Sequence, residues 1–370
     1  MDYTLCVPCL LGMESIISDE LKRLDISNVR NENGRVYFSG DGAQIARANI
    51  NLRCGERILL ELGRFEAKTF DELFESTKAL PWESIIPPDG AFPVKGYSLD
   101  SKLFSVSDCQ KIIKKAVAER LTGKYGINWF EETGALYQIQ FSIMKDTVSL
   151  CIDTSGEGLH KRGYRPAHNA APLKETMAAA MVKLSRYRGR DDFCDPFCGS
   201  GTIPIEAALI ARNRAPGLNR SFSAEGWKCI EGKAWQNAKD EAVGKEYNGK
   251  YCIISSDIDP AALKLAEENA ERAGVADIIR FELADAASFS RKTESGVIVT
   301  NPPYGERIMD KAEAERLYRE FGRAYSGTMN WKLYLLSSHT EFERCFGRNA
   351  DKKRKLYNGM IKCDVFMYYK

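Results

Sequence analysis

The sequence has few histidines and no cluster of cysteines, and both shortages bear on metal binding. His160, His168 and His339 are its three histidines, which are too few and too dispersed for a metal site. The eleven cysteines are scattered, and Cys6 and Cys9 form a lone C-x-x-C in an apolar segment, without the second pair of a zinc site. We therefore expect no bound metal, and free thiols in a reducing compartment.

Long apolar runs and an excess of charge are also missing. No segment approaches the roughly 20 apolar residues that span a bilayer, and residues 1–11 lack the basic start and long apolar centre of a secretory leader. Lys and Arg number 53 against 51 Asp and Glu, so the net charge of +2 does not by itself indicate a nucleic-acid partner. We expect a cytoplasmic protein without membrane contact, in which any polyanion site is a local cluster of basic residues.

A glycine-rich segment, residues 193–202, is the central feature of the chain. With 370 residues and 44% hydrophobic content, the chain is long enough for two or three domains. Within the segment an apolar run reaches Asp195, Gly199 and Gly201 follow, and residues 203–212 read as a helix. A strand, a glycine turn and a helix start are how open α/β sheets hold nucleotide-like ligands. A plain structural turn is the alternative.

The charge of this segment selects among such ligands. No Lys follows the glycines as in a phosphate-binding P-loop, and the third glycine of the dinucleotide fingerprint is missing. The carboxylate of Asp195 repels phosphate and attracts an amine or a sulfonium. The segment therefore favours S-adenosylmethionine over ATP or NAD.

Two later strands of this half also end in acidic residues. Residues 251–255 lead to Asp257, which suits the acid that holds ribose hydroxyls in dinucleotide folds. Residues 278–283 are followed by Asp285, whose carboxylate could meet a purine amino group. Both acids are expected at the carboxyl edge of the sheet, beside Asp195.

The strand over residues 297–300 runs into Asn301-Pro302-Pro303-Tyr304. The exocyclic amine of a purine is a poor nucleophile, because its lone pair is delocalised into the ring. Two acceptors, the Asn301 side-chain carbonyl and the Pro302 peptide carbonyl, would hold its hydrogens and free that lone pair. The prolines stiffen the loop, and Tyr304 offers a face on which a flipped-out base can stack.

Such a loop would act by positioning and electrostatic preorganisation, because the leaving group is a neutral thioether that requires no strong base. A structural turn is the alternative for the loop by itself. Its place after a strand, downstream of Asp195 and Asp257, favours catalysis. Cys198 lies in the glycine turn and not in this loop, so we expect it to pack and not to act as a nucleophile.

The first half of the chain contains two smaller modules. The order β-α-β-α-β over residues 4–62 predicts an α+β, ferredoxin-like module. Helices over residues 71–80 and 107–121 and strands over 92–97, 135–144 and 147–153 form the second. The helix over residues 107–121 has one basic face, which an ordinary solvated surface also explains.

A connection over residues 154–174 leads to the catalytic half. It is rich in Gly and Pro, and residues 160–165 place basic side chains beside an aromatic, which suits phosphate contact and base stacking, although such linkers are often merely solvated. The last segment reads as a hairpin with its turn at Asn358-Gly359. We expect a parallel α/β sheet with an antiparallel strand at its end.

These motifs together resemble the bacterial THUMP-domain class I S-adenosylmethionine-dependent methyltransferases of guanine N2 in 23S ribosomal RNA, a group often named N6-adenine-specific DNA methylases. The resemblance covers nearly the whole chain and is carried by residues 63–65, 68–70, 95–104, 159–165, 171–176, 195–202, 256–260 and 301–304.

The resemblance implies the domain order and the site. The expected fold is a Rossmann-like α/β methyltransferase domain over 191–370, preceded by a ferredoxin-like domain over 1–64, a THUMP RNA-binding domain over 65–154 and a linker with a first helix over 155–190. The implied cofactor-binding residues are Glu175, Thr176, Asp195, Pro196, Gly199, Gly201, Thr202, Asp257, Ile258, Asp285 and Ala286. The implied catalytic residues are Asn301, Pro302, Pro303 and Tyr304. The expected RNA-binding residues are Lys111, Lys114, Lys115, Lys161, Arg162, Tyr164 and Arg165.

The expected reaction is methyl transfer from S-adenosylmethionine, which yields S-adenosylhomocysteine, to guanine N2 in ribosomal RNA or a pre-ribosomal particle. Three alternatives stay open. The same chemistry could act on adenine N6 in DNA or RNA, because both purines present an exocyclic amine. The chain could be a non-catalytic RNA-binding assembly factor with a relic cofactor site. A dehydrogenase is the most distant alternative and would require NAD binding.

Overall fold

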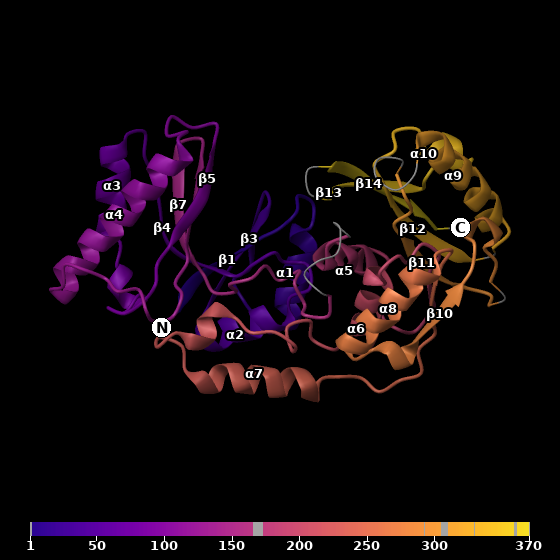
Figure 1. Ribbon diagram of the computed structural model, residues 1–370, viewed down its shortest axis with the longest axis horizontal. Helices are drawn as coiled ribbons and strands as arrows, with labels where there is room; N and C mark the ends of the chain where they lie inside the picture. Colours follow the sequence, from indigo (N-terminus) through magenta and orange to yellow (C-terminus); the bar gives the residue numbers. More distant parts are fainter. Residues whose placement is uncertain are drawn as a thin grey trace. The chain divides into compact units, whose positions relative to one another are not determined.

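The protein forms two compact units, seen in a computed structural model (Figure 1). The model describes residues 2–165, 173–291, 293–304, 310–328, 330–358 and 361–369. Unit 1 comprises residues 1–9, 18–159 and 221–241, and unit 2 comprises 10–17, 160–220 and 242–370. Residues 166–172 of the predicted connection and Gly359 of the predicted hairpin turn lie outside the described residues.

The first 66 residues have the order β-α-β-β-α-β. The elements are β1 (Tyr3–Pro8), α1 (Glu14–Arg23), β2 (Arg30–Glu32), β3 (Arg35–Gly40), α2 (Gly42–Asn51) and β4 (Leu59–Glu66). The sequence-based prediction lacked β2, which has three residues and no apolar alternation. Asp41 and Gln44 form a capping box that starts α2. This is the predicted ferredoxin-like pattern with one added strand.

The second predicted module continues the same sheet. Its elements are α3 (Phe70–Ala79), β5 (Val94–Leu99), α4 (Val106–Tyr125), β6 (Ile139–Met144) and β7 (Thr147–Asp153). The seven strands have the order β2-β3-β1-β4-β7-β6-β5. The central strand β4 pairs with both β1 and β7, and its pairing with β7 has a bulge between Glu61 and Gly63. Figure 1 shows α3 and α4 side by side along the β4, β5 and β7 end of this sheet. The two predicted modules therefore share one strand and one sheet.

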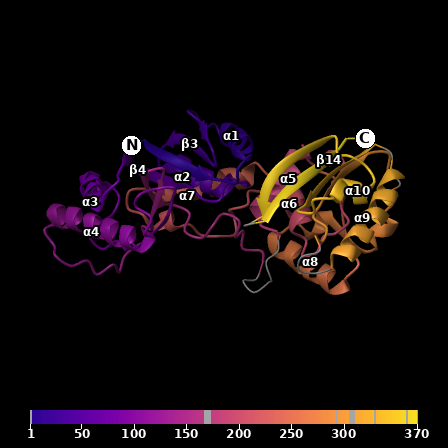
Figure 2. The same cartoon turned by 90° about the horizontal axis from the view of Figure 1, so that it is seen from above.

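A segment from the second half of the chain completes unit 1. Residues 221–241, which include most of α7 (Gly232–Gly244), belong to this unit. Trp227 stacks on Tyr137 with ring centroids 4.8 Å apart, and its indole N–H donates to the Leu136 carbonyl at 2.9 Å. Arg47 of α2 forms an ion pair with Glu241 of α7 at 2.8 Å, and Figures 1 and 2 show α7 beside α2. The sequence did not predict α7.

Unit 2 contains a seven-stranded sheet of the predicted α/β type. Its strands are β8 (Asp192–Asp195), β9 (Ile253–Asp257), β10 (Ile279–Leu283), β11 (Gly296–Thr300), β12 (Trp331–Ser337), β13 (Lys352–Asn358) and β14 (Ile361–Tyr368). The order is β10-β9-β8-β11-β12-β14-β13, with β8 to β12 mutually parallel and β14 antiparallel to both neighbours. The order changes direction between β8 and β11, and open α/β sheets bind ligands at the carboxyl ends of strands at such a point.

Helices cover both faces of this sheet (Figure 1). They are α5 (Glu175–Leu184), α6 (Thr202–Ala211), α8 (Pro260–Ala273), α9 (Lys311–Ser326) and α10 (Phe342–Phe346). Ile298 of β11, Leu333 of β12, Phe321 of α9 and Phe342 of α10 belong to one buried cluster, which fixes α9 and α10 on one face. Among the described helices, none is long and apolar enough to cross a bilayer.

Replacing Trp227 with alanine tests the contribution of residues 221–241 to unit 1. We expect Trp227→Ala to lower the free energy of unfolding by about 3–5 kcal/mol, because it removes a buried ring that stacks on Tyr137. The control is Trp129→Ala, which removes a ring that is 76% exposed and should change stability by less than about 0.5 kcal/mol. Equal urea midpoints for the two variants would contradict a stabilising role for the segment.

Candidate functional site

The carboxyl ends of β8 and β11 are joined by the carboxylate of Asp195. The Thr300 hydroxyl donates to Asp195 Oδ1 at 2.6 Å, and the Phe197 amide donates to the same oxygen at 3.1 Å. Asp195 is buried, and its Oδ2 accepts no hydrogen bond from the part of the chain that the structure describes. Because buried polar atoms normally have partners, this oxygen suits the amine of a bound ligand.

Burial raises the pKa of the Asp195 carboxyl to about 7. The hydrogen bonds from Thr300 and Phe197 oppose this shift, and the nearby Asp257 carboxylate adds to it. The carboxyl group therefore titrates near neutral pH. A cationic ligand would favour its ionised form.

The glycine turn is fastened to the end of β9. The Gly199 amide donates to Asp257 Oδ2 at 2.8 Å. Both turn glycines have positive φ, +51° at Gly199 and +80° at Gly201, where a side chain is strained. A Cβ at Gly201 would lie 2.9 Å from the Ala266 Cβ, so this glycine lets α6 pack closely on α8. A Cβ at Gly199 would meet no described atom within 4 Å, which leaves space for a ligand beside the turn.

Exposed apolar side chains flank the acids at the ends of β9 and β10. Ile258 is 67% exposed and Leu283 is 65% exposed, and Leu283 is the register partner of Asp257. Asp285 follows them and accepts from the Ala287 amide at 2.9 Å, which caps a short 3-10 turn that starts at Ala286. Apolar surface beside carboxylates suits a heteroaromatic ring with an amino group. The sequence analysis did not select Leu283, although it is the last apolar residue of its strand.

Glu175 and Thr202, at the starts of α5 and α6, share one partner, Arg165. The Arg165 guanidinium binds both Glu175 oxygens, Nε to Oε1 at 2.9 Å and Nη2 to Oε2 at 2.6 Å, and its Nη1 donates to Thr202 Oγ1 at 3.3 Å. Thr176 is buried next to Glu175, and Pro196 precedes the glycine turn. Arg165 therefore links two implied cofactor residues, and its charge is paired with the Glu175 carboxylate.

The structure corrects the prediction of direct RNA contact for two residues of the connection. Arg162 is buried and lies 3.4 Å from a carboxylate oxygen of Glu206, and the buried Tyr164 hydroxyl lies 3.3 Å from the same oxygen. Both side chains pack inside unit 2, so neither can reach a nucleic acid at the surface. Lys161, which directly precedes Arg162, is exposed.

The predicted lysines of α4 lie in unit 1 and differ in their surroundings. Lys111 is 79% exposed, and Lys115 is also exposed. Lys114 is half-buried, pairs with Glu132, and holds its Nζ 3.5 Å from the centre of the Phe92 ring. It therefore contributes to the packing of unit 1.

Two tyrosine hydroxyls hold residues 301–304, which follow β11. The Tyr304 hydroxyl donates to Asn301 Oδ1, and the Tyr318 hydroxyl of α9 donates to the Pro303 carbonyl at 2.6 Å. Pro302 is buried, and its carbonyl is the predicted acceptor. Thr300, which binds Asp195, immediately precedes Asn301. Neither Thr300 nor Tyr318 was predicted from the sequence. The signal for Thr300 was its place as a polar residue at the end of an apolar strand.

Cys198 is buried, and burial raises the pKa of its thiol well above the ordinary range. At neutral pH it is a thiol and not a thiolate, which agrees with the expectation that it packs. Among the described residues, no three His, Cys, Asp or Glu side chains gather in a metal-binding group.

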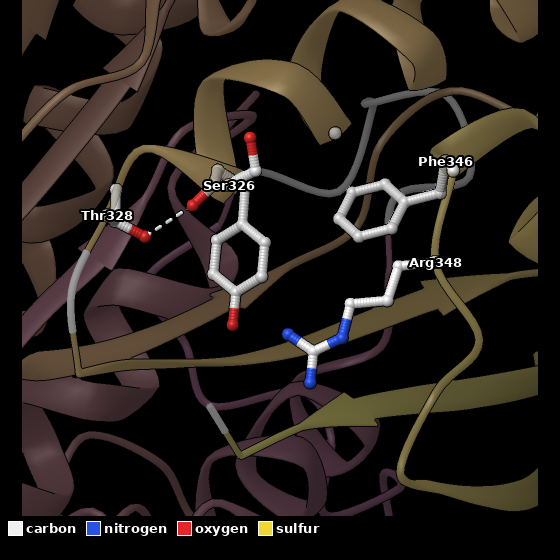
Figure 3. Close-up of a pocket in the computed structure, with 7 residues that line it drawn as sticks. Ser326, Thr328, Phe346 and Arg348 are labelled. Atoms are coloured by element: carbon white, nitrogen blue, oxygen red, sulfur yellow. Dashed lines mark hydrogen bonds between the residues drawn. The ribbon is translucent and has the colours of Figure 1, made fainter.

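A cavity of about 320 Å³ lies elsewhere in unit 2 (Figure 3). Ser326, Thr328, Phe346 and Arg348 line it with Gly322, Tyr325 and Gly347. Ser326 ends α9 and Thr328 lies three residues before β12, so the cavity is near the amino end of that strand. It borders none of the predicted site residues, which cluster at the opposite, carboxyl ends of the strands.

The chain matches three family models in succession. They are the RlmL ferredoxin-like domain over residues 4–59, the THUMP domain over residues 67–153, and the RMKL-like methyltransferase domain over residues 162–366.

Relatives and solved structures match along the whole chain. A Bacillus subtilis protein named "Putative RNA methyltransferase YpsC" is 47% identical over 99% of this chain and 96% of its own length. "Ribosomal RNA large subunit methyltransferase K/L" of Psychromonas ingrahamii is 32% identical over 98% of this chain, which spans 49% of that relative. The structure of SMU.472, titled a putative methyltransferase complexed with SAH, has a TM-score of 0.94 and 38% identity, and covers 100% of this chain and 98% of its own.

The raised pKa of Asp195 predicts a pH dependence of stability that Asp195→Asn removes. In the unfolded chain the carboxyl ionises near pH 4, but in the folded protein it keeps its proton until about pH 7. The folded state thus binds more protons between these values. The free energy of unfolding should fall as pH rises from 4 to 7, by up to about 4 kcal/mol relative to Asp195→Asn, and the difference should stay constant above pH 8. Urea unfolding of both proteins without ligand measures this difference. If their free energies of unfolding changed with pH in the same way, burial would not raise the pKa of Asp195.

Proposed function

Because this chain belongs to the RMKL-like methyltransferase family, we propose that it transfers a methyl group from S-adenosylmethionine to guanine N2 of 23S ribosomal RNA. The family match and the near-identical fold of a structure complexed with SAH confirm the predicted fold class and cofactor. The observation that carries the proposal is the hydrogen bond between Thr300 and Asp195, which fixes the Asn301 loop beside the glycine turn.

S-adenosylmethionine supplies a methyl group on a sulfonium, whose departure leaves a neutral thioether. Asp195 would accept from the ammonium of its methionine portion through the buried Oδ2, and Glu175 and Thr202 would lie near that portion. Asp257 would hold the ribose hydroxyls, since each of its oxygens accepts one amide and keeps a lone pair. Ile258 would contact the adenine ring.

The remaining cofactor contacts would come from the end of β10 and the glycine turn. Asp285 would accept from the adenine amino group, next to the buried Ala286 and the exposed Leu283. Gly199 and Gly201 would let the backbone approach the ligand. Thr176 and Pro196 would shape the methionine end.

The target amine would be held by oxygen atoms of the loop. Asn301 Oδ1 and the Pro302 carbonyl would accept its two hydrogens, so that its lone pair points at the methyl carbon. Because Tyr304 occupies Asn301 Oδ1 in this structure, the incoming amine would replace the tyrosine hydroxyl, whose ring would then stack on the base. The amine forms the new N–C bond as the S–C bond breaks, and it releases a proton to water.

Ribosomal RNA is supported as the substrate by the THUMP match and by the names of the two relatives. The exposed Lys111, Lys115 and Lys161 are the members of the predicted RNA-binding set that the structure leaves at the surface. A ribosomal substrate, as naked RNA or a pre-ribosomal particle, would place the enzyme in the cytoplasm.

The direct test is transfer of labelled methyl groups from S-adenosylmethionine to ribosomal RNA from a strain that lacks this protein. Nucleoside analysis then identifies the base. Label in N2-methylguanosine is the expected result. Label in N6-methyladenosine would replace guanine with adenine, and absence of transfer by protein that binds both cofactor and RNA would favour the non-catalytic alternative.

Two substitutions should separate chemistry from cofactor binding. Asn301→Ala should lower kcat by about 100-fold or more, because it removes an acceptor needed in the transition state, and should leave the affinity for S-adenosylhomocysteine within about twofold. Asp257→Ala should weaken that affinity by roughly 10- to 100-fold, because it removes charged hydrogen bonds to the ligand. Calorimetry and single-turnover assays measure the two quantities. Transfer at the normal rate by Asn301→Ala would refute the role of the loop.

A further inference from the structure

We propose that the β13–β14 hairpin binds an unpaired stretch of RNA beside the target nucleotide, through Tyr357, Lys355 and Lys362. This inference rests on the proposed function, since it supplies RNA contacts for the same site. We call these three residues the hairpin platform.

The strand register places the platform at the end of the sheet where β11 ends and the Asn301 loop begins. Thr300, Leu335, Phe366 and Lys353 form one row across β11, β12, β14 and β13. Tyr357 lies four residues beyond Lys353, which is about 13 Å further in the direction in which β11 ends. The lateral distance from β11 to β13 is three strand spacings, or about 14 Å. A nucleotide chain that enters the Asn301 loop can reach the platform within a few residues.

The three side chains share one face of the hairpin. Lys362 is the direct register partner of Tyr357, and Lys355 precedes Tyr357 by two residues, so alternation along the strand puts all three on the same side. It is also the side of Phe366 and Lys353, which lies against α9 and α10. On this same face, Tyr318 of α9 donates to the Pro303 carbonyl of the Asn301 loop.

Charge and exposure match a single-stranded polyanion. Tyr357 is 38% exposed, and Lys355 and Lys362 are also exposed. Asp364, the register partner of Lys355, lies beside it on the same face and is the one acidic residue among 355–357 and 361–364. An aromatic face between two cations is the arrangement on which a base stacks while lysines contact the adjoining phosphates.

The base of the hairpin is anchored on both faces, so the platform is held in place. Lys353 forms an ion pair with Glu343 of α10 at 2.6 Å on the platform side. Arg354, on the opposite side, donates to the Gly12 carbonyl. Leu356 and Cys363 are register partners and are buried on the face opposite the platform. A strand held in this way loses little backbone freedom on binding, which favours affinity.

The test compares RNA binding of the full-length protein and its variants, with a short fluorescein-labelled single-stranded RNA and the same strand annealed to its complement. Tyr357→Ala should weaken binding to the single strand about tenfold, because one stacked base contributes roughly 1–3 kcal/mol. Tyr357→Phe keeps the ring and should bind like the unmodified protein. Affinity for S-adenosylhomocysteine should not change, because Tyr357 lies outside the predicted cofactor site.

The lysines are tested by salt dependence, with a matched control on the same strand. Replacing Lys355 and Lys362 with Gln should reduce the slope of log affinity against log salt by about 1.4, or about 0.7 for each phosphate that the variant no longer neutralises. Lys352→Gln is the control, because Lys352 is exposed on the other face of β13 and should leave the slope unchanged.

The outcomes separate this inference from the proposed function. If the unmodified protein methylates ribosomal RNA and Tyr357→Ala binds and methylates like it, the platform is wrong and the function stands. If Lys352→Gln lowers the slope as much as the platform lysines do, binding follows overall charge and the platform is again wrong. If the unmodified protein neither binds nor methylates RNA, both are overturned.

Discussion

The hydrogen bond from Thr300 to the buried carboxylate of Asp195 is the contact on which the site depends. It joins the ends of the two strands where the sheet order changes direction, one of which leads to the glycine turn and the other to the Asn301 loop. Burial of the carboxyl group is costly, as its raised pKa shows. The protein engages one carboxylate oxygen, and the other has no hydrogen-bond partner among the described residues.

Two tyrosine hydroxyls donate hydrogen bonds to the loop over residues 301–304. Tyr318 holds the Pro303 carbonyl from α9, and Tyr304 holds the Asn301 side chain from within the loop. One contact is between a buried side chain and the backbone, and the other lies within the loop between two functional side chains. The first fixes the loop conformation, whereas the second would break under the proposed function, when an amine takes the place of the tyrosine hydroxyl.

Much of this arrangement follows from the sequence, and the parts that do not have physical reasons. The helix after the glycine turn was predicted over residues 203–212 and is observed as α6 over Thr202–Ala211, because the glycine turn marks where it starts. The strand β2 was not predicted, because its three residues do not alternate between apolar and polar. Local motifs indicated Asp195, Asp257 and Asn301, but the partner of Asp195 is 105 residues away, which no local pattern shows.

The errors in the connection have a similar origin. Residues 160–165 read as a basic and aromatic segment, and only the packing on Glu206 of α6 shows that Arg162 and Tyr164 point inward. Composition indicates which side chains could bind RNA, but it does not give the direction in which they point.

Residues 221–241 have a consequence for the synthesis of the protein. Domains generally fold in order as the chain leaves the ribosome, the N-terminal one first. Here the indole of Trp227 that covers Tyr137, and the Glu241 carboxylate that pairs with Arg47, are translated after β8 and α6. The nascent N-terminal unit therefore lacks the ring that covers Tyr137 until the first strand and helix of the catalytic sheet have been translated.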